Sequence, residues 1–222
     1  MLRLRDEERI VRESPVQPTR ARREAAPGPP TGWRARSAVL ALAAVVLAGC
    51  ETPTAAGDPL TGAFTLRSDA FRDGGMLDRR FAADDPARGC GGSNVSPPLA
   101  WDHAPRDTRS FALLMLDPDG ARGLGVSHWV AYGIPASIDG FAEGEVSAAS
   151  PHYTGGKGLR GNSAYLGPCP TPGDRPHHYV FTLIALDLDP GALAPGLTRD
   201  EFLAAAKSHL LGAVSLIGRY AR

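Results

Sequence analysis

Short runs of apolar residues, separated by clusters of Gly, Pro and Asp, make up most of the chain after residue 63. The runs at 110–116, 128–134 and 179–186 are continuous and are bounded by turn-forming residues. Runs of that length with such flanks are typical of buried β-strands rather than of helices. The shorter segments 64–66 and 214–217 are further strand candidates.

One segment has the pattern of a helix. Thr198 and Glu201 form a capping box, with the Thr side chain at the start and the Glu three residues later. Apolar residues then recur at helical spacing at Phe202, Leu203, Ala206 and Leu210. Gly212 follows as a stop signal, so we expect the helix to extend to about Leu210. One helix among many strands predicts a mainly β domain.

The first 60 residues have the pattern of an export signal rather than of a folded domain. Residues 38–48 are all apolar and follow Arg34 and Arg36, which suits the core of a secretory signal. This stretch is too short for a membrane-spanning helix, which needs about 20 residues. It ends in Leu-Ala-Gly-Cys at Cys50, which resembles a bacterial lipobox. The alternative is a buried apolar helix that happens to end in Cys.

These features divide the chain into four parts. Residues 1–36 form a basic region that we expect to be disordered, and 37–49 form the signal core with the lipobox. Residues 50–60 hold the lipidated Cys50 and a flexible tether, and 61–222 form the domain. Two acyl chains on Cys50 would anchor the protein stably to a membrane. We therefore expect an exported protein, lipid-anchored to the bacterial cell envelope on its extracytoplasmic face.

Charge is distributed unevenly along the chain. Lys plus Arg and Asp plus Glu both number 24, which gives a net charge of zero. Residues 1–50 hold nine Arg and five acidic residues, which leaves a net charge of −4 for 51–222. A mildly acidic body without a run of Lys or Arg lacks the basic surface of a nucleic-acid-binding protein. We therefore expect no nucleic-acid partner.

Two cysteines remain if Cys50 is lipidated. Cys90 and Cys169 form an even pair in a chain that we expect to be exported, where disulfides persist. They are either a disulfide or two buried free thiols. No Cys or His cluster has the spacing of a zinc site, so no metal is expected.

Candidate binding residues lie at the ends of the predicted strands. Asp117 and Asp119 follow the first long strand, His128 begins the next, and His177 and Tyr179 begin the third. Gly-rich stretches at 155–161 and 167–173 lie between them. Imidazole and backbone N–H groups bind phosphate or carboxylate oxygens, and carboxylates can orient the imidazoles. The alternative is that Asp-Pro-Asp-Gly at 117–120 is only a turn.

Several ordered motifs closely resemble the phosphatidylethanolamine-binding proteins, in particular the bacterial branch called Raf kinase inhibitor-like. They are NVSPPLAW (94–101), SFA (110–112), DPD (117–119), HWV (128–130), IP (134–135), GPCP (167–170), PHHYVFTL (176–183) and LGAVSLIGRY (211–220). The resemblance covers about residues 63–222. It implies a β-sandwich-like fold with few peripheral helices and a pocket for small anions. The pocket residues that it implies are Asp117, Asp119, His128, Gly167, Pro168, His177 and Tyr179.

Two departures from the family pattern bear on the shape of the ligand. Gly120 and Ala121 stand where the family usually has Ala-Pro, and Val126 and Ser127 stand where an aromatic residue is common. The resemblance implies a binding or regulatory protein without a cofactor, whose ligand is a small anion or a lipid headgroup. One alternative is a hydrolase or metal-assisted enzyme that uses the Asp and His residues. Another is an envelope interaction protein with a vestigial pocket.

Overall fold

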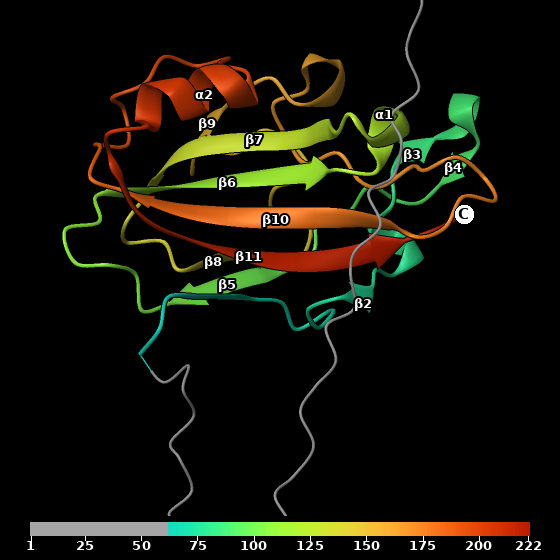
Figure 1. Cartoon of the computed structure of the whole chain (residues 1–222), viewed down its shortest axis with the longest axis horizontal. Coiled ribbons are helices and arrows are strands. Elements are labelled where there is room, and N and C mark those ends of the chain that lie inside the picture. Colours follow the sequence, from blue (N-terminus) through green and yellow to red (C-terminus); the bar gives the residue numbers. More distant parts are fainter. Residues whose placement is uncertain (1–61) are drawn as a thin grey trace, which may run out of the picture. The chain divides into compact units, whose positions relative to one another are not determined.

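Strand β10 (His177–Leu186) lies at the centre of the main sheet. It pairs with β6 (Ser110–Asp117) on one side and with β11 (Leu210–Tyr220) on the other. β7 (Val126–Pro135) pairs with the second edge of β6, and all three pairings are antiparallel. The computed structural model describes residues 62–222, and Figure 1 shows this sheet with its four long strands side by side.

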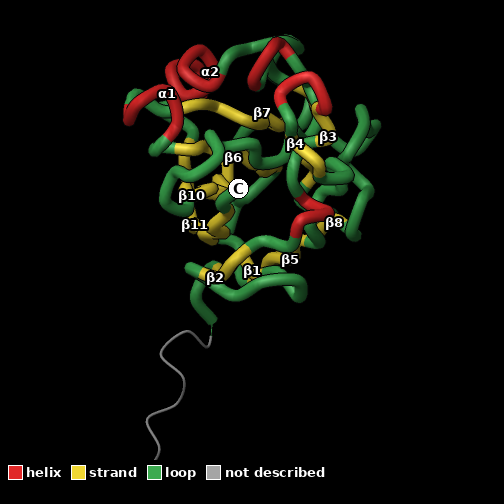
Figure 2. The backbone as a smooth tube through the Cα atoms, turned by 90° about the vertical axis from the view of Figure 1, so that its right-hand side faces the viewer, coloured by secondary structure: helices red, strands yellow, loops and turns green. Residues whose placement is uncertain are grey.

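The complete main sheet has six strands in the order β2-β11-β10-β6-β7-β9. A three-stranded sheet, β1-β5-β8, faces it, and β3 and β4 form a separate pair (Figure 2). The shorter elements are β1 (Thr65–Arg67), β2 (Gly75–Met76), η1 (Arg79–Phe81), β3 (Asp84–Asp85), η2 (Pro86–Arg88), β4 (Cys90–Gly91), β5 (Leu99–Asp102), α1 (Gly120–Gly123), β8 (Gly140–Phe141), β9 (Thr154–Gly155), η3 (Leu159–Gly161) and α2 (Arg199–Ala206).

Both faces of the main sheet are covered by apolar side chains. Between the two sheets, Phe111, Trp129 and Phe181 belong to one large core cluster. On the outer face, Tyr132 stacks on Phe202 of α2, with ring centroids 5.3 Å apart, in a second cluster. Because successive residues of a strand point to opposite faces, a strand covered on both sides is apolar throughout. This explains why the long strands are visible in the sequence as continuous runs.

The structure confirms a mainly β fold with few helices. The predicted strands at 110–116, 128–134 and 179–186 lie within β6, β7 and β10, and the segments at 64–66 and 214–217 overlap β1 and β11. No helix within residues 62–222 has the length and hydropathy needed to cross a bilayer. The signal core, Cys50 and the tether lie outside the described residues.

The predicted extent of the helix was wrong. The capping box forms, since Thr198 Oγ1 accepts from the Glu201 N–H and the Glu201 side chain accepts from the Thr198 N–H. However, α2 ends at Ala206, and Leu210 begins β11. Leu210 pairs with Leu186 at the end of β10. Long-range strand pairing therefore overrides the helical spacing of this last apolar residue.

A disulfide joins Cys90 to Cys169, with Cα atoms 5.7 Å apart and a sequence separation of 79 residues. It connects β4 to the segment that precedes β10, and thus two parts of the chain that share no strand pairing. Of the two alternatives for this pair, the structure has the bridge rather than two free thiols.

Replacing both Cys90 and Cys169 by Ala should lower the free energy of unfolding by about 2–4 kcal/mol, because the unfolded chain regains the entropy that the closed loop removes. Chemical denaturation of the purified protein measures this difference. The matched control is Cys50→Ala, which removes a cysteine outside the described domain and should leave the stability unchanged. Equal stability of the double variant and the wild type would contradict the prediction.

Candidate functional site

Three strand ends meet at one end of the main sheet. β6 ends at Asp117, β7 begins at Val126 and β10 begins at His177. Because neighbouring strands run antiparallel, the last residue of β6 lies beside the first residues of both neighbours. The sheet thereby brings together Asp117, His128 and His177, which lie up to 60 residues apart in the sequence.

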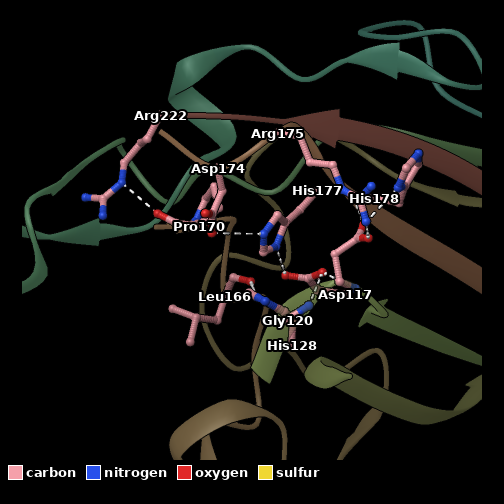
Figure 3. A network of polar contacts seen from close by, with 11 residues as sticks. Asp117, Gly120, His128, Leu166, Pro170, Asp174, Arg175, His177, His178 and Arg222 are labelled. Atoms are coloured by element: carbon pink, nitrogen blue, oxygen red, sulfur yellow. Dashed lines mark hydrogen bonds and ion pairs between the residues drawn. The ribbon is translucent and has the colours of Figure 1, made fainter. Parts of the chain in front are cut away.

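Asp117 is the centre of a buried polar network (Figure 3). Its Oδ1 accepts from the backbone N–H groups of Asp119 and Gly120, both at 2.9 Å. Its Oδ2 accepts from Nδ1–H of His177 at 2.8 Å. On the far side of that ring, Nε2 lies 3.6 Å from Oδ2 of Asp174. The carboxylate thus closes its own turn and fixes the orientation of the His177 ring.

His128 lines a small cavity of about 50 Å³ beside this network. Its Nδ1 lies 2.9 Å from the carbonyl oxygen of Leu166, which can only accept, so Nδ1 carries a proton. Nε2 has no hydrogen bond to any residue between 62 and 222. Burial lowers the pKa of His128, while the Leu166 carbonyl and the Asp117 carboxylate partly oppose that shift. The ring is therefore neutral at neutral pH, with the lone pair of Nε2 available.

Tyr179 lies under both imidazoles. Its ring meets the edge of His128 at 5.3 Å between centroids and stacks on His177 at 6.5 Å. Its hydroxyl is buried and has no hydrogen-bond partner within the described part of the chain. Burial and the nearby Asp117 carboxylate raise the pKa of this phenol, so it stays protonated. A neutral hydroxyl without a partner is a donor for a group with excess oxygen lone pairs.

Gly167 lines the cavity, whereas the next residue, Pro168, does not; both are held against the segment that follows η1. The Gly167 N–H donates to Oδ1 of Asn94 at 2.8 Å, and the Pro168 carbonyl accepts from the Ala83 N–H at 2.9 Å. A Cβ atom at position 167 would lie 2.1 Å from the Phe81 carbonyl oxygen, so only glycine fits here. Because the Gly167 N–H already donates to Asn94, it is not available as a donor to a bound anion.

Asp119 does not join this cavity. Its Oδ2 accepts from both the backbone N–H and the ring Nδ1–H of His178, each at 2.8 Å. These bonds, the backbone one first, lower the pKa of the Asp119 carboxyl. Of the residues expected in the pocket, the structure brings His128 and Gly167 to the cavity and packs Asp117, His177 and Tyr179 beside them.

The loop after Asp119 explains one departure from the family pattern. Ala121 has a φ of 51°, in the left-handed region. Proline, whose ring fixes φ near −65°, cannot occupy that position. This loop therefore follows a different path from one with Ala-Pro at the same place.

Three charged residues that line the cavity were not predicted from the sequence: Asp85, Arg88 and Arg160. Arg160 lies in a stretch that attracted notice only for its glycines, and Asp85 and Arg88 lie in a segment that carried no pattern. Nothing in their spacing predicts that these two segments meet. Within residues 62–222, no three His, Cys, Asp or Glu side chains converge as ligands for a metal ion.

Comparison with known proteins agrees with the motifs and with the fold. The chain is 37% identical over 161 residues to the UPF0098 protein of Methanothermobacter thermautotrophicus, which covers 71% of this chain and 98% of that protein. It is 36% identical over 173 residues to LppC of Mycobacterium tuberculosis, a protein named as a lipoprotein, with 76% of each chain covered.

Among solved structures, the fold is similar to that of YbcL from Escherichia coli, which is described as a member of the mammalian PEBP family. The TM-score is 0.65 at 26% identity, over 72% of this chain and 98% of that one. The family model described as phosphatidylethanolamine-binding protein matches residues 67–221. The chain therefore belongs to the phosphatidylethanolamine-binding protein family.

Proposed function

We propose that this protein binds a small anionic group, of the phosphate, lipid-headgroup or carboxylate type, in the cavity beside His128. The observation that carries this proposal is a cavity lined by two arginines, Arg88 and Arg160, beside the unbonded Nε2 of His128, which becomes a donor when an anion draws a proton onto the ring. The Tyr179 hydroxyl, beside the same ring, is a further donor. Cations and oriented donors in a partly desolvated site favour an anion.

A binding or regulatory role fits this arrangement better than catalysis. Asp117 already accepts three hydrogen bonds, which leaves it poorly placed as a general base. Ser163, a hydroxyl in the nearby loop that could serve as a nucleophile, lies against Gly155 and lines a different cavity. We therefore propose a protein that holds its ligand without turnover.

Removing either imidazole should weaken binding of inorganic phosphate. We expect His128→Ala to cost roughly 1.5–3 kcal/mol, or about 10- to 150-fold in affinity, as for a hydrogen bond to a charged group. His177→Ala should weaken binding indirectly, through the loss of its contacts with Asp117 and Tyr179. Calorimetric titration of the purified protein measures it.

His209→Ala is the matched control, because its Nδ1 is bonded to Asp187 in the same way, at 2.7 Å, at the opposite end of β10 and β11. This variant should bind phosphate as the wild type does. Unchanged affinity in both pocket variants, or no binding at all by the wild type, would favour the alternative of an interaction protein with a vestigial pocket.

Anion affinity should rise as the pH falls. A bound anion favours the imidazolium form of His128, so its pKa is higher in the complex than in the free protein, where burial lowers it. Binding therefore takes up a proton, and affinity is lost as the pH rises through the pKa of the complex. The slope is at most about tenfold per pH unit for one proton.

Sulfate is the suitable probe for this dependence, because it carries two charges throughout the range from about pH 5.5 to about pH 8, where His titrates. Calorimetry in buffers of different ionisation enthalpy counts the proton directly. In His128→Gln the pH slope should vanish. A wild-type affinity for sulfate that stays constant across this range would rule out the coupling.

We further propose that the protein is exported and anchored through a lipid on Cys50. The lipobox-like sequence supports this, as does the similarity to a relative named as a lipoprotein. In bacterial cells fed a fatty-acid analogue, the wild-type protein should become labelled and Cys50→Ser should not. Cys90→Ser is the control and should keep the label. Labelling of the Cys50 variant would refute the anchor.

A further inference from the structure

An ion pair lies at the outer wall of the cavity. Nη2 of Arg160 donates to Oδ2 of Asp85 at 2.6 Å, and both residues line the cavity opposite the sheet. Arg160 is half exposed, at 48%, whereas the Asp85 side chain is only 16% exposed. The two residues are 75 positions apart in the chain, so this contact joins two segments that are distant in the sequence.

The backbone holds Arg160 in this place. Its φ of 62° and ψ of 21° lie in the left-handed region, which residues other than glycine seldom adopt. The loop is closed by a bond from the Gly158 N–H to the Asn162 carbonyl at 2.9 Å. A Cβ atom at Gly158 would lie 2.5 Å from the His128 carbonyl, so this loop packs directly on β7 beside the imidazole.

The charges at this wall are unequal. Asp85 is one carboxylate facing two guanidinium groups, and the hydrogen bond from Arg160, then the charges of Arg160 and Arg88, lower its pKa. The pair therefore stays ionised, and the wall keeps one excess positive charge. Arg160 donates one of its five N–H groups to Asp85, and no other hydrogen bond from its side chain is formed within residues 62–222. Donors thus remain for a second acceptor.

We propose that Arg160 is the specificity-determining residue of the anion pocket and selects a phosphate group with two negative charges over a carboxylate with one. This inference rests on the proposed anion binding. A guanidinium gains more from a doubly charged, multi-oxygen ligand than from a singly charged one. Asp85 positions Arg160 and competes with the ligand for it, so the two residues act on affinity in opposite directions.

The charge of the phosphate group distinguishes its possible sources. Inorganic phosphate and a monoester such as phosphoethanolamine both present the required dianion. A phosphodiester such as glycerophosphoethanolamine carries one charge on its phosphate and has a substituent on each side. It should bind more weakly than either of them.

The test measures the affinities of the purified full-length protein for phosphate, phosphoethanolamine, glycerophosphoethanolamine and acetate. In Arg160→Gln, affinity for the first two should fall about tenfold or more, with acetate changing less than about threefold. In Asp85→Asn, phosphate affinity should rise, because the competing charge is gone. Arg67→Gln is the control, since Arg67 forms a similar exposed pair with Asp102 away from the cavity.

Arg160→Lys covers the case in which the Gln variant does not fold. It keeps the charge and loses the planar fork, so phosphate affinity should fall less than in Arg160→Gln, and the preference over acetate should persist in reduced form. Loss of binding in His128→Ala together with an unchanged phosphate-to-acetate ratio in both Arg160 variants would overturn this inference and leave the anion pocket standing. Loss of phosphate affinity in both Asp85→Asn and Arg160→Gln would assign the pair a purely structural role. A wild-type protein that binds no phosphate would overturn both proposals.

Discussion

The antiparallel pairing of β6 with β10 and β7 is the constraint on which the rest of the molecule depends. It places the end of one apolar strand beside the starts of two others, and polar residues at strand ends thereby become neighbours. Asp117 then joins two of these ends, because one carboxylate accepts from its own turn and from His177. A buried carboxylate needs such partners, since an unpaired one would cost several kcal/mol. The site therefore depends on register, and a shift of one residue along β6 would break it.

The wall that faces this sheet end is built by other means. It consists of loops and very short elements, which cannot hold their shape by strand pairing alone. The Cys90–Cys169 bridge and the hydrogen bond from the Ala83 N–H to the Pro168 carbonyl tie these loops together. Arg222 adds a further tie, because its guanidinium donates to the carbonyl groups of Pro170 and Arg88. One side of the cavity is thus positioned by a sheet, and the other by the disulfide and these hydrogen bonds. The sequence of the loops can therefore vary while the sheet keeps the imidazoles in place.

The same division explains what the sequence could predict. The long strands were recognisable because both of their faces are buried, and the imidazoles were found because they lie at strand starts. β8 and β9, with two residues each, are too short to show any periodicity. The end of α2 was misjudged because Leu210 serves strand pairing, a contact made with a distant part of the chain. Asp85 and Arg160 were missed for a related reason. The contact between them depends on the conformations of two loops and leaves no periodic pattern in the sequence.

The part of the chain after residue 50 carries a net charge of −4, which is unfavourable for attracting an anion over long distances. Screening at physiological ionic strength reduces that repulsion within about 8 Å, so local groups decide the outcome. At the cavity these groups are an imidazole that can gain a proton and two guanidiniums partly compensated by one carboxylate, and a buried phenol packs beside the imidazole. Such a site gives little electrostatic steering and derives its selectivity from short-range geometry. To select a ligand by its number of charges, such a site needs a cation that is held in place but not fully neutralised. Arg160 meets that requirement, because it donates one hydrogen bond to the Asp85 carboxylate, whose charge also interacts with Arg88.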